Sequence, residues 1–340
     1  MRTLMRMIVP AAALWLAAQH ALAQDKIELK ASTFVPPTHW FFADILQSWA
    51  AEIARRTGDK ATLRLFAGNS PFGNVANQAD QVAAGVTDIA LGLNGVPRGR
   101  LPRTLIMELP LVAPGSTAAT RTLWSMRESH LADDYKGFKL LGLNCSSGIG
   151  FFTREKKIEK IDDLKGLRIR APSSQIQAAL QHLGAVPVTM GPAQIYESLE
   201  KRTLDGVAMV YDGLVGFRLE GLVKYFYPAE MFVTCFHIVM NQVKYEALPA
   251  DVKNAIDATT GDAWTAAFPK GWDKSEQVSG AAARAKGVVE APVAAGLRAR
   301  WREQFKPVID QQLAELEKQG VANARAIYEE MLKRSADFAR

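Results

Sequence analysis

The sequence lacks the short motifs that identify the most common catalytic sites. It contains no G-x-x-x-x-G-K-[ST] loop for binding phosphates, no G-x-S-x-G nucleophile turn and no H-E-x-x-H zinc motif. The glycine-containing stretch at residues 146–150 is explained by an ordinary strand-to-loop turn. Neighbouring carboxylates such as Asp162 and Asp163 lie in polar turns, where acidic residues commonly begin helices. These absences argue against an enzyme.

Cysteine and histidine are scarce, with two and five residues in a chain of 340. A structural zinc site needs four ligands, so two cysteines would require histidines at matching spacing. The histidines beyond the N-terminal segment are widely separated and do not have that spacing (His39, His130, His182 and His237). We therefore expect no metal site and no cofactor.

Neither sign of charge dominates the chain. It has 41 Lys and Arg residues against 35 Asp and Glu, a formal net charge of +6, and the basic residues are scattered along the sequence. Nucleic-acid binding would require a basic stripe together with a matching motif, and the sequence has neither. We expect no nucleic-acid partner, whereas a modest positive balance is compatible with anionic ligands.

Long apolar runs are missing after the N-terminal residues, which excludes a protein with several membrane spans. At the N-terminus, Arg2 and Arg6 precede an apolar stretch at 8–18, and Ala21-Leu22-Ala23 is a small-x-small cleavage site. The alternatives are an uncleaved anchor and a buried helix, but the stretch is shorter than the ~20 residues of a bilayer span. We interpret residues 1–23 as a signal peptide cleaved after Ala23, which predicts export.

The rest of the chain indicates two domains of mixed strands and helices. Its length exceeds the ~100–200 residues of a typical domain, and 48% of its residues are hydrophobic. Strand and helix patterns alternate, which predicts parallel sheets with helical crossovers. Strands are predicted at 26–32, 61–66, 88–93, 139–144, 166–171, 187–190, 206–210 and 233–240. Helices are predicted at 41–57, 74–85, 174–183, 194–201, 252–268, 274–286, 295–319 with a kink at Pro307, and 322–338.

The central part of the chain carries a run of short segments in a characteristic order. Residues 161–206 contain D-L-K-G, R-I-R-A-P, L-G-A-V-P-V-T-M, Y-E-S-L and L-D-G. This order and spacing resemble the signature region of the solute receptors of tripartite ATP-independent periplasmic (TRAP) transporters. The resemblance covers nearly the whole chain after residue 23. It extends to the segments 34–39, 85–90, 99–102, 108–110, 239–241 and 248–252.

The resemblance implies an α/β fold of the periplasmic binding protein type II kind. It is a clamshell of two α/β lobes joined by hinge strands, with a long C-terminal helix spanning both. The implied division is 24–146 plus 236–273 for lobe I, 147–235 plus 274–306 for lobe II, and C-terminal helices at 307–340 that pack on the lobes.

The resemblance also implies a function. A small-molecule carboxylate would bind in the cleft between the lobes of a monomeric periplasmic receptor. The receptor would then deliver it to the small and large membrane subunits of a TRAP transporter for ion-gradient-driven uptake. A receptor for an ATP-driven transporter or for a sensor is the alternative, and an exported enzyme on the same fold is a further one.

Arg170 is the first candidate for holding the ligand. Its position in R-I-R-A-P matches the arginine that grips the ligand carboxylate in the family that the chain resembles. A guanidinium offers a planar fork of donors that fits a carboxylate and keeps its charge. Arg168 lies on the same face of the strand, so alternation does not distinguish the two. The register of the motif and the nearby Pro172 favour Arg170.

Two departures from the family pattern bear on the ligand. Many receptors for dicarboxylates and sialic acid carry a second arginine in G-x-R-x-x-T/S, where this sequence has Gly150. Met209 replaces an asparagine found downstream in the family. A dicarboxylate would bury its second charge without a partner. We therefore expect a monocarboxylate, such as an aromatic acid, in preference to a C4-dicarboxylate.

The remaining candidate cleft residues follow predicted strands, because open α/β sheets bind ligands at the carboxyl ends of their strands, except Phe236, which lies near a hinge crossing. Aromatic side chains around one arginine would suit a planar organic anion. His39 either donates a hydrogen bond to a ligand or caps the first helix. The candidates are Phe34, His39, Trp40, Asn94, Ser173, Met209, Tyr211, Asp212 and Phe236.

The two cysteines are not explained by the family pattern. In the implied clamshell, Cys145 ends the strand that leaves lobe I and Cys235 lies on the strand that returns to it. A disulfide between them requires Cα atoms roughly 4.4–6.8 Å apart, which a sequence does not establish. Free, buried cysteines that act as small apolar residues are the interpretation that we favour over a bridge.

Overall fold

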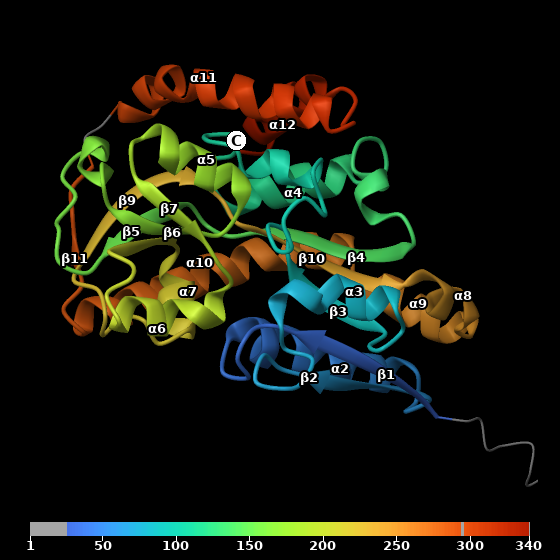
Figure 1. The fold of residues 1–340 in the computed structure, drawn as a ribbon. Coiled ribbons are helices and arrows are strands. Elements are labelled where there is room, and N and C mark those ends of the chain that lie inside the picture. Colours follow the sequence, from blue (N-terminus) through green and yellow to red (C-terminus); the bar gives the residue numbers. More distant parts are fainter. Residues whose placement is uncertain (1–25, 294–295, 340) are drawn as a thin grey trace, which may run out of the picture.

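The computed structural model describes residues 26–293 and 296–339, so the predicted signal peptide, residues 1–23, lies outside the described residues. The described chain forms two β-sheets with helices packed around them (Figure 1). We call the part around the five-stranded sheet lobe I and the part around the six-stranded sheet lobe II. This is the predicted α/β arrangement of two lobes with a long C-terminal helix.

The sheet of lobe I has the strand order β2-β1-β3-β10-β4. Its first three strands are parallel, as the alternation of strands and helices predicts, and β10 runs antiparallel between β3 and β4. The strands are β1 (Ile27–Thr33), β2 (Ala61–Phe66), β3 (Ile89–Leu93), β4 (Phe138–Cys145) and β10 (Cys235–Asn241). The crossover elements are η1 (Phe41–Leu46, one stretch of π-helix), α2 (Gln47–Arg56), η2 (Val75–Asn77) and α3 (Gln78–Ala83).

The sheet of lobe II has the order β11-β9-β5-β8-β6-β7. Parallel pairs β6–β7 and β6–β8 place the carboxyl ends of β6 and β8 at one edge of the sheet. The strands are β5 (Ile149–Thr153), β6 (Arg168–Ala171), β7 (Val186–Thr189), β8 (Gly206–Met209), β9 (Tyr225–Phe232) and β11 (Val289–Glu290). The helices are η5 (Ile161–Leu164), α5 (Ser174–His182), η6 (Pro192–Gln194), α6 (Ile195–Glu200) and α7 (Tyr211–Gly216).

The chain crosses between the two sheets at residues 146–148 and again at 233–234. At this hinge Cys145 of β4 stands opposite Cys235 of β10, with their Cα atoms 4.0 Å apart, and the two form a disulfide. The interpretation of these residues as free cysteines was wrong. The antiparallel register, which spacing in the sequence does not reveal, places them at a closely approaching, non-hydrogen-bonded pair of positions.

The helical C-terminal third covers both lobes. Helix α11 packs against α5 of lobe II, whereas α12 packs against α4 of lobe I, so the pair spans the junction between them (Figure 1). The remaining helical elements are η3 (Thr104–Glu108), α4 (Ser116–Met126), η4 (Ala132–Tyr135), α8 (Gln242–Ala247), α9 (Ala250–Thr259), α10 (Asp262–Ala285), α11 (Leu297–Lys318) and α12 (Ala324–Phe338). Within the described ranges, the longer helices are too polar to cross a bilayer.

The break predicted after Phe268 was wrong. Gly261, with a φ of 58°, separates α9 from α10 instead, and α10 continues through Pro269. A proline inside a helix costs about 3 kcal/mol. Burial of Trp264, Phe268 and Trp272 on the same helix offsets that cost, since each buried aromatic contributes ~1.5–3 kcal/mol. Strands β5, β9 and β11 were not predicted: residues 149–150 of β5 were assigned to a turn, and Pro228 and Glu230 interrupt the alternation of β9.

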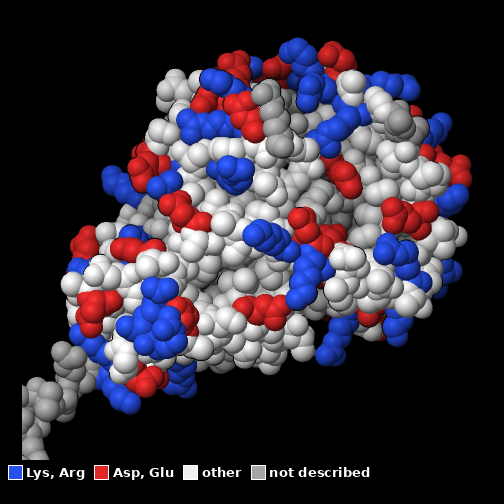
Figure 2. All heavy atoms as spheres, turned by 180° about the vertical axis from the view of Figure 1, so that it is seen from behind, with Lys and Arg blue, Asp and Glu red and all other residues white. Residues whose placement is uncertain are grey.

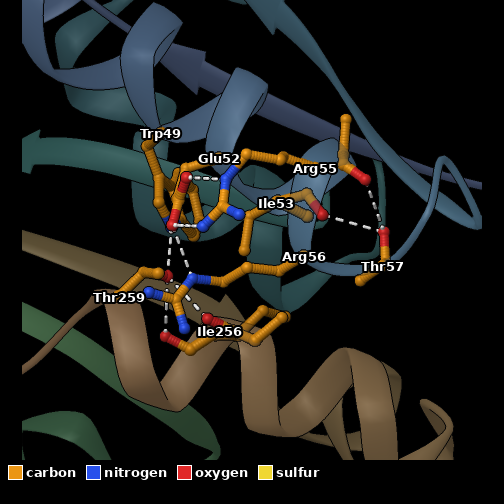
Figure 3. Close-up of polar contacts among 10 residues, drawn as sticks. Trp49, Glu52, Ile53, Arg55, Arg56, Thr57, Ile256 and Thr259 are labelled. Atoms are coloured by element: carbon orange, nitrogen blue, oxygen red, sulfur yellow. Dashed lines mark hydrogen bonds and ion pairs between the residues drawn. The ribbon is translucent and has the colours of Figure 1, made fainter.

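Helices α2 and α9 show how the outer layer is attached to lobe I (Figure 3). The Trp49 indole donates a 2.9 Å hydrogen bond to Thr259 at the end of α9. On the exposed side of α2, Glu52 accepts hydrogen bonds from Arg55 and Arg56, which lower the pKa of Glu52 to about 2. The buried indole therefore fixes the helix pair, and the exposed ion pairs contribute little because water screens them.

Charged side chains of both signs are interspersed over the face shown in Figure 2. No broad patch of a single sign covers this face, as expected from the scattered basic residues of the sequence.

Candidate functional site

A small cavity of about 60 Å3 lies where the two lobes meet. Its walls come from the loop after β1, the carboxyl ends of β6 and β8, the two hinge crossings and the middle of α10. Most of the wall is apolar, with several aromatic rings, and five polar side chains, Thr234 among them, reach it. The apolar wall includes Phe34, Phe41, Phe217, Phe236, Met209 and Trp272, and the polar side chains include His39, Ser146, Arg170 and Asp212.

Arg170 supplies the positive charge of this cavity. It stands near the carboxyl end of β6, and only 4% of its surface is exposed. Its Nε donates to the carbonyl of Met190 at 3.1 Å, and Nη1 approaches the carbonyl of Ala208 at 3.5 Å. Burial lowers the pKa of Arg170 to about 10, opposed by the charge of Glu108, so the guanidinium stays protonated at neutral pH. Two backbone carbonyls thus orient the group and leave donors for a ligand.

Arg168 points to a different environment, although it shares a strand face with Arg170. Its guanidinium forms a two-pronged pair with Asp205, at 2.7 Å and 3.0 Å, and its side chain is 42% exposed. Asp205 therefore supplies both the charge partner and the hydrogen-bond acceptors of Arg168 at the start of β6. The structure therefore places Arg170, and not Arg168, in the cavity.

His39 and Asp212 join the two lobes across the cavity. The Nε2 of His39 lies 2.9 Å from Oδ2 of Asp212, and both side chains are buried. The backbone N–H of Phe41 donates to Nδ1 of His39, which leaves Nε2–H to donate to Asp212. Burial raises the pKa of Asp212, but the interaction with His39 and a hydrogen bond from Ser275 outweigh burial and hold that pKa below its ordinary value. Residues after β1 and β8 thus meet at the cleft.

The cavity brings together six of the ten predicted site residues: Phe34, His39, Arg170, Met209, Asp212 and Phe236. The other four lie outside its lining. The Trp40 ring packs on Phe41 and Trp272, beside Gly271. Asn94 accepts a 2.8 Å hydrogen bond from His237 in the core. Ser173 caps α5, and the hydroxyl of Tyr211 donates to Glu290 on the far side of lobe II.

Sequence reasoning missed several residues of the wall. Trp272 lies in a stretch where a helix break was expected, so it had no assigned face. Phe217 follows α7 at the end of a short helix, with no motif around it. Phe41 carries the periodicity of an ordinary helical core position. The available signal for Phe217 in the sequence is that it is an aromatic residue shortly after the L-D-G strand, whose other following residues were chosen as candidates.

The structure explains why Gly150 stands where other receptors have an arginine. A Cβ atom on Gly150 would lie 2.2 Å from the ring of Phe226 and 2.6 Å from the carbonyl of Tyr227. Phe226 itself is buried and stacks on Phe152, with ring centroids 4.2 Å apart, so a shift of its ring would disturb that packing. Position 150 therefore has no room for a side chain in this packing. Among the described residues, Arg170 supplies the one guanidinium or ammonium group in the cavity lining.

We expect Gly150→Ala to destabilise the folded protein by about 1–3 kcal/mol, the usual cost of overpacking a core. The measurement is the free energy of unfolding in urea. Gly221→Ala is the matched control, because no atom lies within 4 Å of the added Cβ and the φ of that glycine is not left-handed. Equal stabilities of the two variants would contradict this account of the packing.

Comparison with known proteins supports a single family. The family model described as bacterial extracellular solute-binding protein, family 7, matches residues 31–316. A TRAP solute-binding protein from Rhodoferax ferrireducens T118, solved with copurified benzoate, is 25% identical. The two structures superpose with a TM-score of 0.86 over 92% of this chain and 99% of that one. A marine metagenome TRAP solute-binding protein with 3-hydroxybenzoate is 24% identical, with a TM-score of 0.88 over 93% and 99%.

Two relatives match in sequence over shorter stretches. The outer membrane transporter protein TsaT of Comamonas testosteroni is 26% identical over 72% of this chain and 73% of its own length. The 2,3-diketo-L-gulonate-binding periplasmic protein YiaO of Escherichia coli is 24% identical over 65% of this chain, and the match spans 66% of that protein.

Proposed function

This chain belongs to family 7 of the bacterial extracellular solute-binding proteins, the TRAP receptors, and we propose that it binds a small aromatic or other monocarboxylic acid around Arg170. The observation that carries the proposal is one buried guanidinium, oriented by two carbonyls, in a cavity with aromatic walls. A buried guanidinium that no carboxylate contacts directly is a costly arrangement, and a bound anion would offset that cost.

The aromatic walls support a planar ligand. Phe34 and Phe236 are nearly parallel, at 11°, with centroids 6.3 Å apart, and Trp272 stacks on Phe236 at 5.5 Å. Flat, parallel faces favour an aromatic ring through stacking and burial. The cavity volume is well below the ~300–1,000 Å3 of pockets for drug-sized ligands, which favours a small ligand. Similar receptors were solved with benzoate and with mandelate.

The polar pair at the cleft supports closure around the ligand. Lobe I, as we propose it, comprises 24–146 with 236–273, lobe II comprises 147–235 with 274–306, and 307–340 pack on both. His39 comes from the first and Asp212 from the second, so their 2.9 Å contact forms only when the lobes approach. The closed receptor would then dock on the small and large membrane subunits of a TRAP transporter in the periplasm. We propose a monomer that delivers its ligand unchanged, without catalysis.

A thermal-shift screen of organic acids tests the proposal. An acid present at 100 times its Kd should add about 2.7 kcal/mol to the free energy of unfolding, because it binds only the folded state. Benzoate and 3-hydroxybenzoate are the first acids to try, with benzamide as the uncharged control of the same shape. We expect a shift with an acid and none with the amide. Folded protein that no carboxylate stabilises would contradict the proposal.

A further inference from the structure

Glu108 is a buried carboxylate that the proposed ligand site does not use directly. It ends η3 and has no exposed surface. Its Oε1 accepts a 2.8 Å hydrogen bond from the backbone N–H of Cys235, the first residue of β10. Its Oε2 has no well-oriented donor among the described residues, and Ser173 lies beside the carboxylate. One carboxylate oxygen of Glu108 therefore accepts a hydrogen bond from the hinge strand, while the other has no hydrogen-bond partner among the described residues.

Glu108 lies behind the cavity wall that carries Arg170, because Cys235, which donates to Glu108, is flanked in the chain by Thr234 and Phe236 of the cavity lining. Burial raises the pKa of Glu108 to about 7, against the opposing effects of Ser173, the Cys235 N–H and the Arg170 charge. In return, the charge of Glu108 raises the pKa of Arg170 against the effect of burial. In the absence of ligand, Glu108 is thus the anion that partly compensates the buried guanidinium.

The other elements packed against η3 bring no competing charge. From β10, His237 is neutral, since burial lowers its pKa to about 3. Asp134 and Tyr135 lie at the opposite end of η3. There the hydroxyl of Thr104 donates to the carboxylate of Asp134 and lies 3.1 Å from the hydroxyl of Tyr135. Ser173 of the α5 cap and Ser116 of α4 are uncharged. The charged side chains of α12 pair on the outer surface, as in Arg334–Glu330 and Arg325–Asp310.

We propose that the binding of a carboxylate at Arg170 is coupled to the uptake of one proton by Glu108. This inference rests on the proposed function. A bound carboxylate would be a second anion beside the same buried guanidinium, and like charges in a buried site favour protonation of one of them. The ligand acid is the stronger acid of the two, so the proton, taken from solvent, goes to Glu108. Oε2 then becomes a donor, and the hydroxyl of Ser173 can accept from it.

The coupling predicts tighter binding at lower pH. A group whose pKa rises on binding favours binding below its pKa in the free protein, and the effect disappears as pH rises through the pKa of the complex. With a free value of about 7, affinity at pH 6 should exceed affinity at pH 8 roughly fivefold to tenfold. A simple carboxylate ligand remains ionised over this range, so its own titration does not contribute.

Isothermal titration calorimetry with benzoate or 3-hydroxybenzoate at pH 7 tests the coupling. The titration is repeated in phosphate, HEPES and Tris, whose ionisation enthalpies differ, and the slope of the apparent enthalpy gives the protons taken up. We expect a fractional uptake in the wild type and none in Glu108→Gln, whose amide oxygen still accepts from Cys235. Glu276→Gln is the matched control: burial also raises the pKa of Glu276 to about 7, but its partners are the N–H groups of Tyr211 and Asp212.

The outcomes separate this inference from the proposed function. Binding with no proton uptake by the wild type would overturn the coupling and leave the function intact, whether or not Glu108→Gln folds. Uptake that persists in Glu108→Gln, or that is lost only in Glu276→Gln, would also overturn it. If neither acid binds nor any other carboxylate does, the proposed function fails and the coupling fails with it. Uptake lost in Glu108→Gln and retained in Glu276→Gln would support it.

Discussion

Arg170→Ala should abolish most of the affinity for the carboxylate ligand. We expect a loss of ~2–5 kcal/mol, roughly 30- to 5,000-fold in Kd, because the ligand anion would be buried without its partner. The backbone carbonyls of Met190 and Ala208 would lose the hydrogen bonds that they accept from the guanidinium, but these carbonyls are uncharged. The variant also leaves Glu108 buried without a nearby cation, so its fold is to be checked by circular dichroism. The measurement is calorimetric titration with the acid that the thermal screen identifies.

Two variants serve as controls for this result. Arg168→Ala removes an arginine from the same strand face, but one paired with Asp205 outside the cavity, and should leave Kd within about twofold. Arg170→Lys retains the charge but not the planar fork, and should still lose much of the affinity. Unchanged binding in Arg170→Ala together with lost binding in Arg168→Ala would assign the ligand to the other arginine.

Removal of the Cys145–Cys235 disulfide should cost the folded protein about 4–5 kcal/mol in the chain-entropy model for a loop of this length. The bridge closes 90 positions of chain, and the unfolded chain gains that freedom when the bridge is absent. Because both cysteines are fully buried, the double variant Cys145→Ala/Cys235→Ala is a cleaner test than a reductant added to folded protein. The measurement is the urea midpoint of the variant against the oxidised wild type.

A chemical control accompanies that comparison. Wild-type protein that is exported, purified without reductant and denatured should show no reactive thiols, whereas the reduced protein should show two per chain. Because the bridge lies on the hinge strands and outside the cavity lining, we expect the variant to keep its carboxylate affinity while it is folded. Two free thiols in the unreduced wild type would contradict the disulfide.

The architecture could be predicted from the sequence where local patterns and the motif agreed. The strands around Lys30 and Arg170 follow from alternation, and the order of the 161–206 segments predicted the family. Helix α10 could not be predicted, since Pro269 signals a break locally and only the burial of three aromatics with distant partners overrides it. Similarly, β9 has no clean alternation because Pro228 and Glu230 interrupt it.

The site was predicted in part for the same reason. Arg170 and Met209 lie at the carboxyl ends of strands that the motif identifies, and Asp212 follows the second of these strands, so their position at the cleft could be inferred. Residues that follow a strand do not all point the same way, and the sequence does not show that Tyr211 turns toward Glu290 while its neighbour Asp212 turns toward His39. The disulfide likewise depends on the register of two strands that are far apart in the chain.

The most direct test of the central claim is a crystal structure of the protein with the acid that stabilises it. We expect both carboxylate oxygens to lie within hydrogen-bond distance of the Arg170 guanidinium. The organic part of the ligand should contact Phe34, Phe236 or Trp272, with His39 and Asp212 in contact across the closed lobes. A ligand whose carboxylate is held elsewhere, with Arg170 not contacting it, would contradict the account.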